Sequence, residues 1–190
     1  RRRLGVGLWT QRDWPRGRLT RLVGNSMVEA LVQFFSSWPT PLATAALAAL
    51  PVTELRLAIP IAMHVWSLAP FDALLYAFLG NLLPIVPLYF GLMKLRDVCE
   101  KRLPRLVRPI DAMLGRGERK LKSQYARYGA FALFLFTAIP LPLTGVWSAT
   151  VAAVALKIPF KSAVLGIAFG ALAAGVIVTV LSITADVVLQ

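Results

Sequence analysis

The apolar residues of this chain are gathered into blocks that are separated by short polar or proline-rich breaks. A helix that crosses a bilayer needs about 20 residues, and residues 71–93 and 162–185 both reach that length. The other blocks are shorter or interrupted: residues 41–50 and 61–66 flank one break, and residues 129–156 contain a second break in their middle. This pattern predicts an all-α integral membrane protein.

A shorter amphipathic segment lies ahead of these blocks. Val28, Leu31, Val32 and Phe35 recur at helical spacing within residues 26–38, which predicts a short helix with one apolar face. Because it is too short to cross a bilayer alone, we expect it to lie at the membrane interface or to begin a broken span.

The first break holds two opposite charges inside an apolar region. Glu54 and Arg56 lie between Pro51 and Pro60. A charge in hydrocarbon is costly unless it is paired or solvated, and interrupted backbone at membrane depth occurs only where protein or a water-filled cavity surrounds it. We therefore predict a re-entrant hairpin with its charged tip inside the protein. The prolines favour an extended tip, on which Glu54 and Arg56 would lie on the same side and pair.

The second break is also rich in helix-breaking residues, but it carries no charge. It contains Pro140, Pro142, Thr144, Gly145 and Trp147, and it predicts a second re-entrant hairpin. The apolar block of residues 71–93 contains one polar amide, Asn81. This side chain needs a hydrogen-bond partner, either in an interhelical contact or in a ligand contact.

The two halves of the chain match each other. When the sequence is shifted by 89 residues, Pro51 falls on Pro140 and Pro70-Phe71 falls on Pro159-Phe160. Paired interrupted segments at corresponding positions indicate a transporter-type site. We predict an inverted repeat in which each half is a re-entrant helical hairpin followed by a transmembrane helix.

The net charge of +12 is unevenly distributed. Eleven lysines and arginines lie in residues 94–127, and seven arginines lie within the first 21 residues. Such segregation is typical of segments that flank a membrane, and it argues against a nucleic-acid partner. It places residues 94–127 in the cytoplasm and predicts that one hairpin enters from each side.

These patterns divide the chain into four segments. They are a basic N-terminal arm (residues 1–25), a first membrane repeat (26–93), a basic cytoplasmic loop (94–127) and a second membrane repeat (128–190). The arm has the composition of a transit-peptide remnant or of a tail on anionic lipid. We expect the bilayer to be a partner, with anionic lipids at the basic loop; a homo-oligomer is compatible with the pattern.

The sequence offers little for covalent catalysis. It contains one histidine, His64, and one cysteine, Cys99. It lacks a cluster of metal-ligating residues and a glycine-rich phosphate loop. We therefore expect no enzyme activity, no metal and no cofactor.

Two motifs resemble a known family. They are Glu54-Leu55-Arg56-x-Ala58-Ile59-Pro60 in the first half and Pro140-x-Pro142-x-Thr144-Gly145-x-Trp147 in the second. They resemble the small multidrug export protein family, which is related to the DedA/VTT superfamily of membrane proteins. The resemblance implies an inverted repeat, two re-entrant loops that meet within the membrane, and transport. The wider superfamily is associated with lipid scrambling and proton-dependent transport, although the second motif here lacks an acidic residue.

The working hypothesis is a membrane exporter of small amphipathic molecules, with a polar cavity between the two re-entrant loops. The alternatives are a lipid scramblase and a scaffold that transports nothing. We expect a bacterial inner membrane or, as the alternative, the membrane of a chloroplast or another organelle. The predicted pathway residues are Glu54, Arg56, Pro60, Asn81, Pro140, Pro142, Thr144, Gly145 and Trp147.

Overall fold

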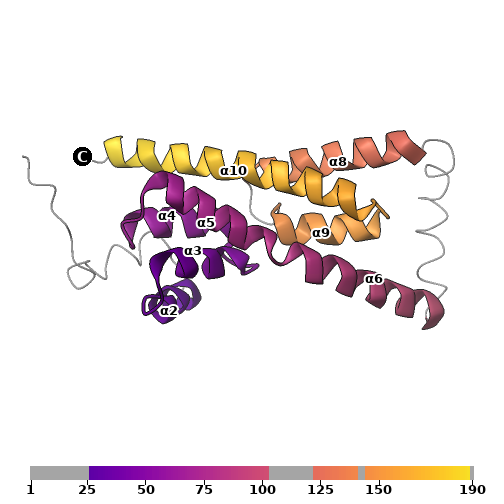
Figure 1. The fold of residues 1–190 in the computed structure, drawn as a ribbon, viewed down its shortest axis with the longest axis horizontal. Helices are drawn as coiled ribbons and strands as arrows, with labels where there is room; N and C mark the ends of the chain where they lie inside the picture. The colour runs from indigo at the N-terminus through magenta and orange to yellow at the C-terminus, as the bar shows by residue number, and fades with distance from the viewer. Residues whose placement is uncertain (1–25, 103–121, 141–143, 189–190) are drawn as a thin grey trace, which may run out of the picture.

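The computed structural model describes residues 26–102, 122–140 and 144–188, and all regular structure in these ranges is helical (Figure 1). The all-α prediction is confirmed. The basic N-terminal arm and residues 103–121 of the basic loop lie outside the described residues. The helices are α2 (Ser26–Phe35), α3 (Thr40–Ala49), α4 (Glu54–His64), α5 (Pro70–Leu82), α6 (Ile85–Arg102), α8 (Lys122–Ala138), α9 (Val146–Ala155) and α10 (Phe160–Val188).

Two helical stretches are long and apolar enough to cross a membrane. They are Pro70–Arg96, which joins α5 to most of α6, and Phe160–Ala185 in α10. The first of them is interrupted at Leu83 and Pro84, where a proline removes a backbone donor. Helix α6 continues to Arg102 and α8 starts at Lys122, so both ends of the predicted basic loop are helical.

Each half of the chain contains a pair of short helices followed by a longer helical stretch. In the first half, α3 packs against α4 and both pack against α5; in the second, α8 and α9 both pack against α10. The halves are joined crosswise, because α4 packs against α10 and α6 packs against α9. Figure 1 shows α3 and α4 towards one end of the molecule and α8 and α9 towards the other.

Glycines allow the closest helix contacts within each half. A side chain at Gly80 would collide with the Ala45 carbonyl of α3, and one at Gly170 would collide with the Phe134 carbonyl of α8. Small residues at such crossings let two backbones approach each other. Both contacts therefore fix the first short helix of a half directly onto its long helix.

Each of the turns that lead into α5 and α10 contains one left-handed residue. Ser67 has φ 53° and Lys157 has φ 54°, values in the left-handed region that non-glycine residues adopt only infrequently. The backbone N–H of Leu68 donates to the Ala62 carbonyl, and that of Ile158 donates to the Ala153 carbonyl, both at 2.9 Å. The Ile158 bond spans five residues and closes α9 in the manner of a Schellman motif, whereas the Leu68 bond spans six residues and closes α4 in a wider turn.

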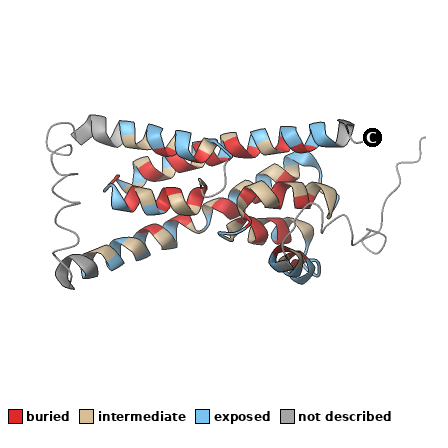
Figure 2. Ribbon diagram, turned by 180° about the vertical axis from the view of Figure 1, so that it is seen from behind, coloured by how far each residue is buried: buried red, intermediate tan, exposed pale blue. Residues whose placement is uncertain are grey.

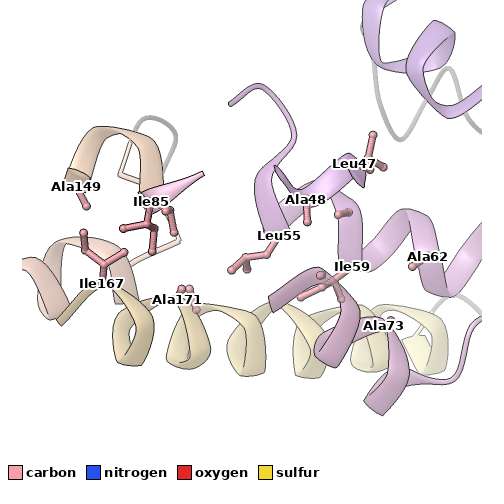
Figure 3. Close-up of a cluster of buried hydrophobic side chains, with 14 of the residues drawn as sticks. Leu47, Ala48, Leu55, Ile59, Ala62, Ala73, Ile85, Ala149, Ile167 and Ala171 are labelled. Carbon is pink, nitrogen blue, oxygen red and sulfur yellow. The ribbon is translucent and has the colours of Figure 1, made fainter. Parts of the chain in front are cut away.

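The core lies between the helices, and the outer faces are also apolar. Leu55 and Ile59 of α4 lie beside α10 (Figure 3), where both side chains approach Gly175. Buried residues line the inner sides of the helices, and exposed residues line their outer sides (Figure 2). The exposed side chains on the two long stretches include Phe71, Leu75, Leu79, Leu83, Val86, Phe90, Leu165, Phe169, Leu172, Val176 and Val180. Apolar surface of this extent is unusual on a soluble monomer and suits contact with lipid.

The prediction of an extended tip that holds both charges is wrong. Helix α4 begins at Glu54, so Arg56 lies in its first turn, and the helix passes through Pro60. Pro60 removes one backbone hydrogen bond, and Leu55, Ala58 and Ile59 around it are buried. Burial of this apolar face holds the helix together where proline propensity alone would end it.

Candidate functional site

The amino-terminal end of α4 lies at the break between α8 and α9. Thr53 precedes α4 and is buried; its hydroxyl donates to the carbonyl of Leu47 in α3. The backbone N–H of Glu54 donates to the Leu50 carbonyl at 3.0 Å. Glu54 has φ 46°, a conformation that costs free energy for a residue with a side chain. The short connection between α3 and α4 therefore fixes the backbone position from which the Glu54 side chain extends.

Arg56 binds both sides of the break between α8 and α9. Its guanidinium donates to the Thr144 carbonyl at 2.8 Å, to Thr144 Oγ1 at 3.1 Å and to the Ile139 carbonyl at 3.3 Å. Thr144 Oγ1 in turn donates to the Ile139 carbonyl at 2.8 Å. Ile139 directly follows α8, where the unpaired carbonyls carry the negative pole of the helix dipole, and Thr144 lies just before the N-cap of α9. A cation from the first half therefore satisfies the interrupted backbone of the second half.

Glu54 binds the amino end of α9. Its carboxylate accepts a hydrogen bond from the backbone N–H of Trp147 and lies directly against Gly145. Gly145 is the N-cap residue of α9 and has no side chain with which to cap it. An N-cap oxygen normally accepts from the second or third helical N–H, and Trp147 is the second residue of α9. Glu54 supplies that oxygen from another part of the chain.

The contact is reciprocated by the second half. The indole Nε1 of Trp147 donates to the Ala49 carbonyl at 3.2 Å, and Ala49 is the last residue of α3. The charges of Glu54 and Arg56 are near enough to interact electrostatically. Each break thus supplies groups that satisfy helix ends at the other break.

The structure brings five of the predicted pathway residues together: Glu54, Arg56, Thr144, Gly145 and Trp147. The remaining predicted residues are placed differently. Pro60 lies further along α4, Pro140 is exposed just after α8, and Pro142 lies outside the described residues.

Asn81 is buried in α5 with only 1% of its surface exposed. Its Oδ1 has no hydrogen-bond donor among the described residues. A buried acceptor without a donor costs free energy, so this amide is a candidate for contact with a ligand or water, as the sequence hypothesis allowed.

Sequence reasoning missed Thr53 and the backbone carbonyls of Ala49 and Ile139. Helix ends leave carbonyls without intrahelical partners, and both carbonyls belong to residues that end a helix beside a proline-rich break. The positions of the breaks indicated that these carbonyls would lack an intrahelical partner. Which donor binds each carbonyl depends on tertiary contacts.

The site can supply a carboxylate, a guanidinium, an indole and a hydroxyl. No group of three or more His, Cys, Asp or Glu residues that could hold a metal occurs in the described part of the chain. The carboxylate, guanidinium, indole and hydroxyl of this site are suited to the reversible binding of a ligand and to compensation of its charge.

Comparisons with known proteins agree with the sequence resemblance. No curated protein and no solved structure matches the chain. A protein-family model matches residues 54–177, from the first charged residue of α4 into α10; it begins directly after the α3–α4 break and includes the α8–α9 break. The family description names an export protein, which is not an enzyme class, and together with the two apolar helical stretches it indicates a membrane protein. The chain belongs to the family described as "Putative small multi-drug export protein".

Proposed function

We propose that this protein exports small amphipathic molecules across a membrane through a polar pathway between the α3–α4 break and the α8–α9 break. The observation that carries the proposal is that Glu54 and Arg56 of the first half bind the interrupted backbone of the second half. Charged residues within an apolar membrane region mark substrate or ion pathways more often than structural contacts.

We propose further that the halves form an inverted repeat with two re-entrant hairpins. The reciprocal packing of α4 on α10 and of α6 on α9 supports this arrangement. The Ala45–Gly80 and Phe134–Gly170 contacts recur 89 or 90 residues apart, as do the left-handed residues Ser67 and Lys157. Binding sites of inverted-repeat transporters lie where such discontinuous helices meet.

In the proposed mechanism, Arg56 attracts the anionic part of a substrate and Glu54 carries the coupling proton. Protonation removes the negative charge that faces Arg56 and the Trp147 N–H. Both contacts weaken as a result, because hydrogen bonds to charged groups are stronger than those between neutral groups. The two breaks then separate on one side of the membrane, and deprotonation restores the contact.

The bacterial inner membrane is the proposed location. Lipid scrambling is the alternative function, and the proteoliposome experiment described below tests it as well. In that case the pathway between the breaks would pass phospholipid headgroups. A scaffold is the outcome if neither small molecules nor lipids move.

The test uses the purified chain in proteoliposomes with an imposed pH gradient. One arm follows a fluorescent amphipathic dye, and the other follows a fluorescently labelled phospholipid. We expect dye movement that Glu54→Gln abolishes and that Lys161→Gln, an exposed control on α10, leaves intact. Lipid movement without dye movement would favour the scramblase, and equal dye movement in empty vesicles would refute export.

A further inference from the structure

A second polar feature lies away from the two breaks, between α6 and the turn that joins α9 to α10. A groove with a volume of about 580 Å³ opens there. Its lining includes two cationic side chains, Arg96 and Lys157, and three aromatic rings, Tyr89, Phe90 and Phe160. None of these five residues takes part in the site between the breaks.

The cationic end of the groove is held in place by backbone contacts. Arg96 donates to the Val154 carbonyl at 2.8 Å and to the Ala155 carbonyl at 3.1 Å, at the carboxyl end of α9. Lys157 occupies the left-handed position that ends α9, and its backbone N–H donates to the Val154 carbonyl at 3.1 Å. The Arg96 guanidinium is therefore fixed at the carboxyl end of α9, and the Lys157 side chain extends from an ordered turn.

The other end of the groove is apolar and equally ordered. The ring centroid of Phe160 lies 5.1 Å from that of Tyr89 and 5.0 Å from that of Phe90. The Tyr89 hydroxyl donates to the Ile158 carbonyl at 2.7 Å, which fixes its ring against the turn. Phe90 and Met93 remain 48% and 42% exposed, so this wall presents apolar surface outward.

The groove lies where two apolar stretches end. The stretch Pro70–Arg96 finishes at Arg96, and Phe160–Ala185 starts at Phe160. Cationic and aromatic side chains at such ends lie at the level of lipid headgroups. An occupant of this groove must therefore be anionic at one end and apolar at the other.

We infer that the groove between α6 and the α9–α10 turn binds an anionic phospholipid. The phosphate lies between Arg96 and Lys157, since guanidinium and ammonium groups are the usual hydrogen-bond donors to phosphate oxygens in proteins. The part of the acyl chain nearest the headgroup lies along Phe90, Met93 and Phe160. Free phosphate shares the first contact and lacks the second.

The test measures the melting temperature of the full chain in detergent after addition of lipid. The three additions are phosphatidylglycerol, phosphatidylcholine and sodium phosphate, the last as the source of anion without an acyl chain. We expect phosphatidylglycerol to raise the melting temperature by several degrees, because a ligand that binds only the folded state stabilises it. Phosphatidylcholine and sodium phosphate should raise it much less.

Two matched variants separate this site from general attraction of anionic lipid. Lys157→Asn removes the charge with a residue that tolerates a left-handed conformation, and Lys161→Asn removes an exposed charge outside the groove lining. We expect Lys157→Asn to lose most of the phosphatidylglycerol-induced rise and Lys161→Asn to keep it. Phe90→Ala, which changes no charge, should lose part of the rise.

Three outcomes would overturn the inference. Equal losses in Lys157→Asn and Lys161→Asn would show that the lipid responds only to net surface charge. If sodium phosphate raised the melting temperature as much as phosphatidylglycerol does, the ligand would be a free anion. If phosphatidylglycerol stabilised Phe90→Ala as much as the unsubstituted protein, no acyl chain would contact Phe90.

Discussion

The guanidinium of Arg56 donates to both the carbonyl and the hydroxyl oxygen of Thr144, at 2.8 Å and 3.1 Å, across 88 residues of sequence. Thr144 directly precedes the N-cap of α9, so this pair of bonds positions the residues that face Glu54. The contact between the halves is therefore built from one cation that binds backbone and one carboxylate that caps a helix.

Glu54 and Arg56 should depend on each other. Glu54→Gln leaves the Arg56 charge without the neighbouring carboxylate, and Arg56→Gln leaves the Glu54 charge without the cation. Residues that share one network have coupling energies of about 0.5–3 kcal/mol. We expect the double variant to be more stable than the sum of the single losses implies, while dye transport remains absent. Melting temperatures of the two single variants and the double variant measure the coupling.

Additive losses in those melting temperatures would show that the two charges act independently. A double variant that still transports dye would assign both residues to structure alone.

Gly145→Ala should destabilise the protein because its new methyl group meets the Glu54 carboxylate. The backbone itself accepts alanine, since Gly145 has φ −92°. Overpacking at a tight site costs about 1–3 kcal/mol. The measurement is the melting temperature of Gly145→Ala with and without Glu54→Ala, which removes the carboxylate.

Gly91→Ala is the matched control, because a methyl group at Gly91 would meet nothing within 4 Å. Gly91 lies inside α6, where alanine is favoured over glycine by about 0.5–1 kcal/mol. If Gly145→Ala were as well tolerated as Gly91→Ala, the close contact with Glu54 would not exist in solution.

Trp147→Phe should weaken the contact between the breaks and keep most of the packing. The substitution removes the hydrogen bond from the indole to the Ala49 carbonyl, which is worth about 0.5–1.5 kcal/mol. Trp66→Phe is the control, since the buried indole nitrogen of Trp66 has no acceptor among the described residues. We expect a larger loss of melting temperature and of dye transport in Trp147→Phe, and equal losses would contradict the contact.

Cys99 reports the sidedness of the basic loop. The positive charge of residues 94–127 predicts a cytoplasmic location, and Cys99 is the only cysteine in the chain. An impermeant thiol reagent should label Cys99 in inverted membrane vesicles and leave it unlabelled in intact cells. Labelling from outside intact cells would reverse the predicted topology.

The helical blocks and both breaks could be predicted from sequence because hydrophobicity and proline act locally. The same local signals gave the wrong backbone at Glu54 and Arg56. Pro60 has a poor intrinsic preference for a helix interior, yet Leu55 and Ile59 are buried against other helices. Tertiary burial outweighed propensity at this point.

The partners of the predicted site residues could not be read from sequence. A carboxylate beside proline-rich segments indicates a polar site, but the role of Glu54 as the cap of α9 depends on a contact with a segment about 90 residues away. The groove at Arg96 was missed for the same reason, because its cations come from α6 and from the α9–α10 turn.

The crosswise packing of α4 on α10 and of α6 on α9 has a consequence for how the molecule is assembled. Each half leaves part of its apolar surface to be covered by the other, so neither half can complete its own core. Two fragments separated within residues 103–121 should each be degraded when produced alone and should accumulate as a complex when produced together.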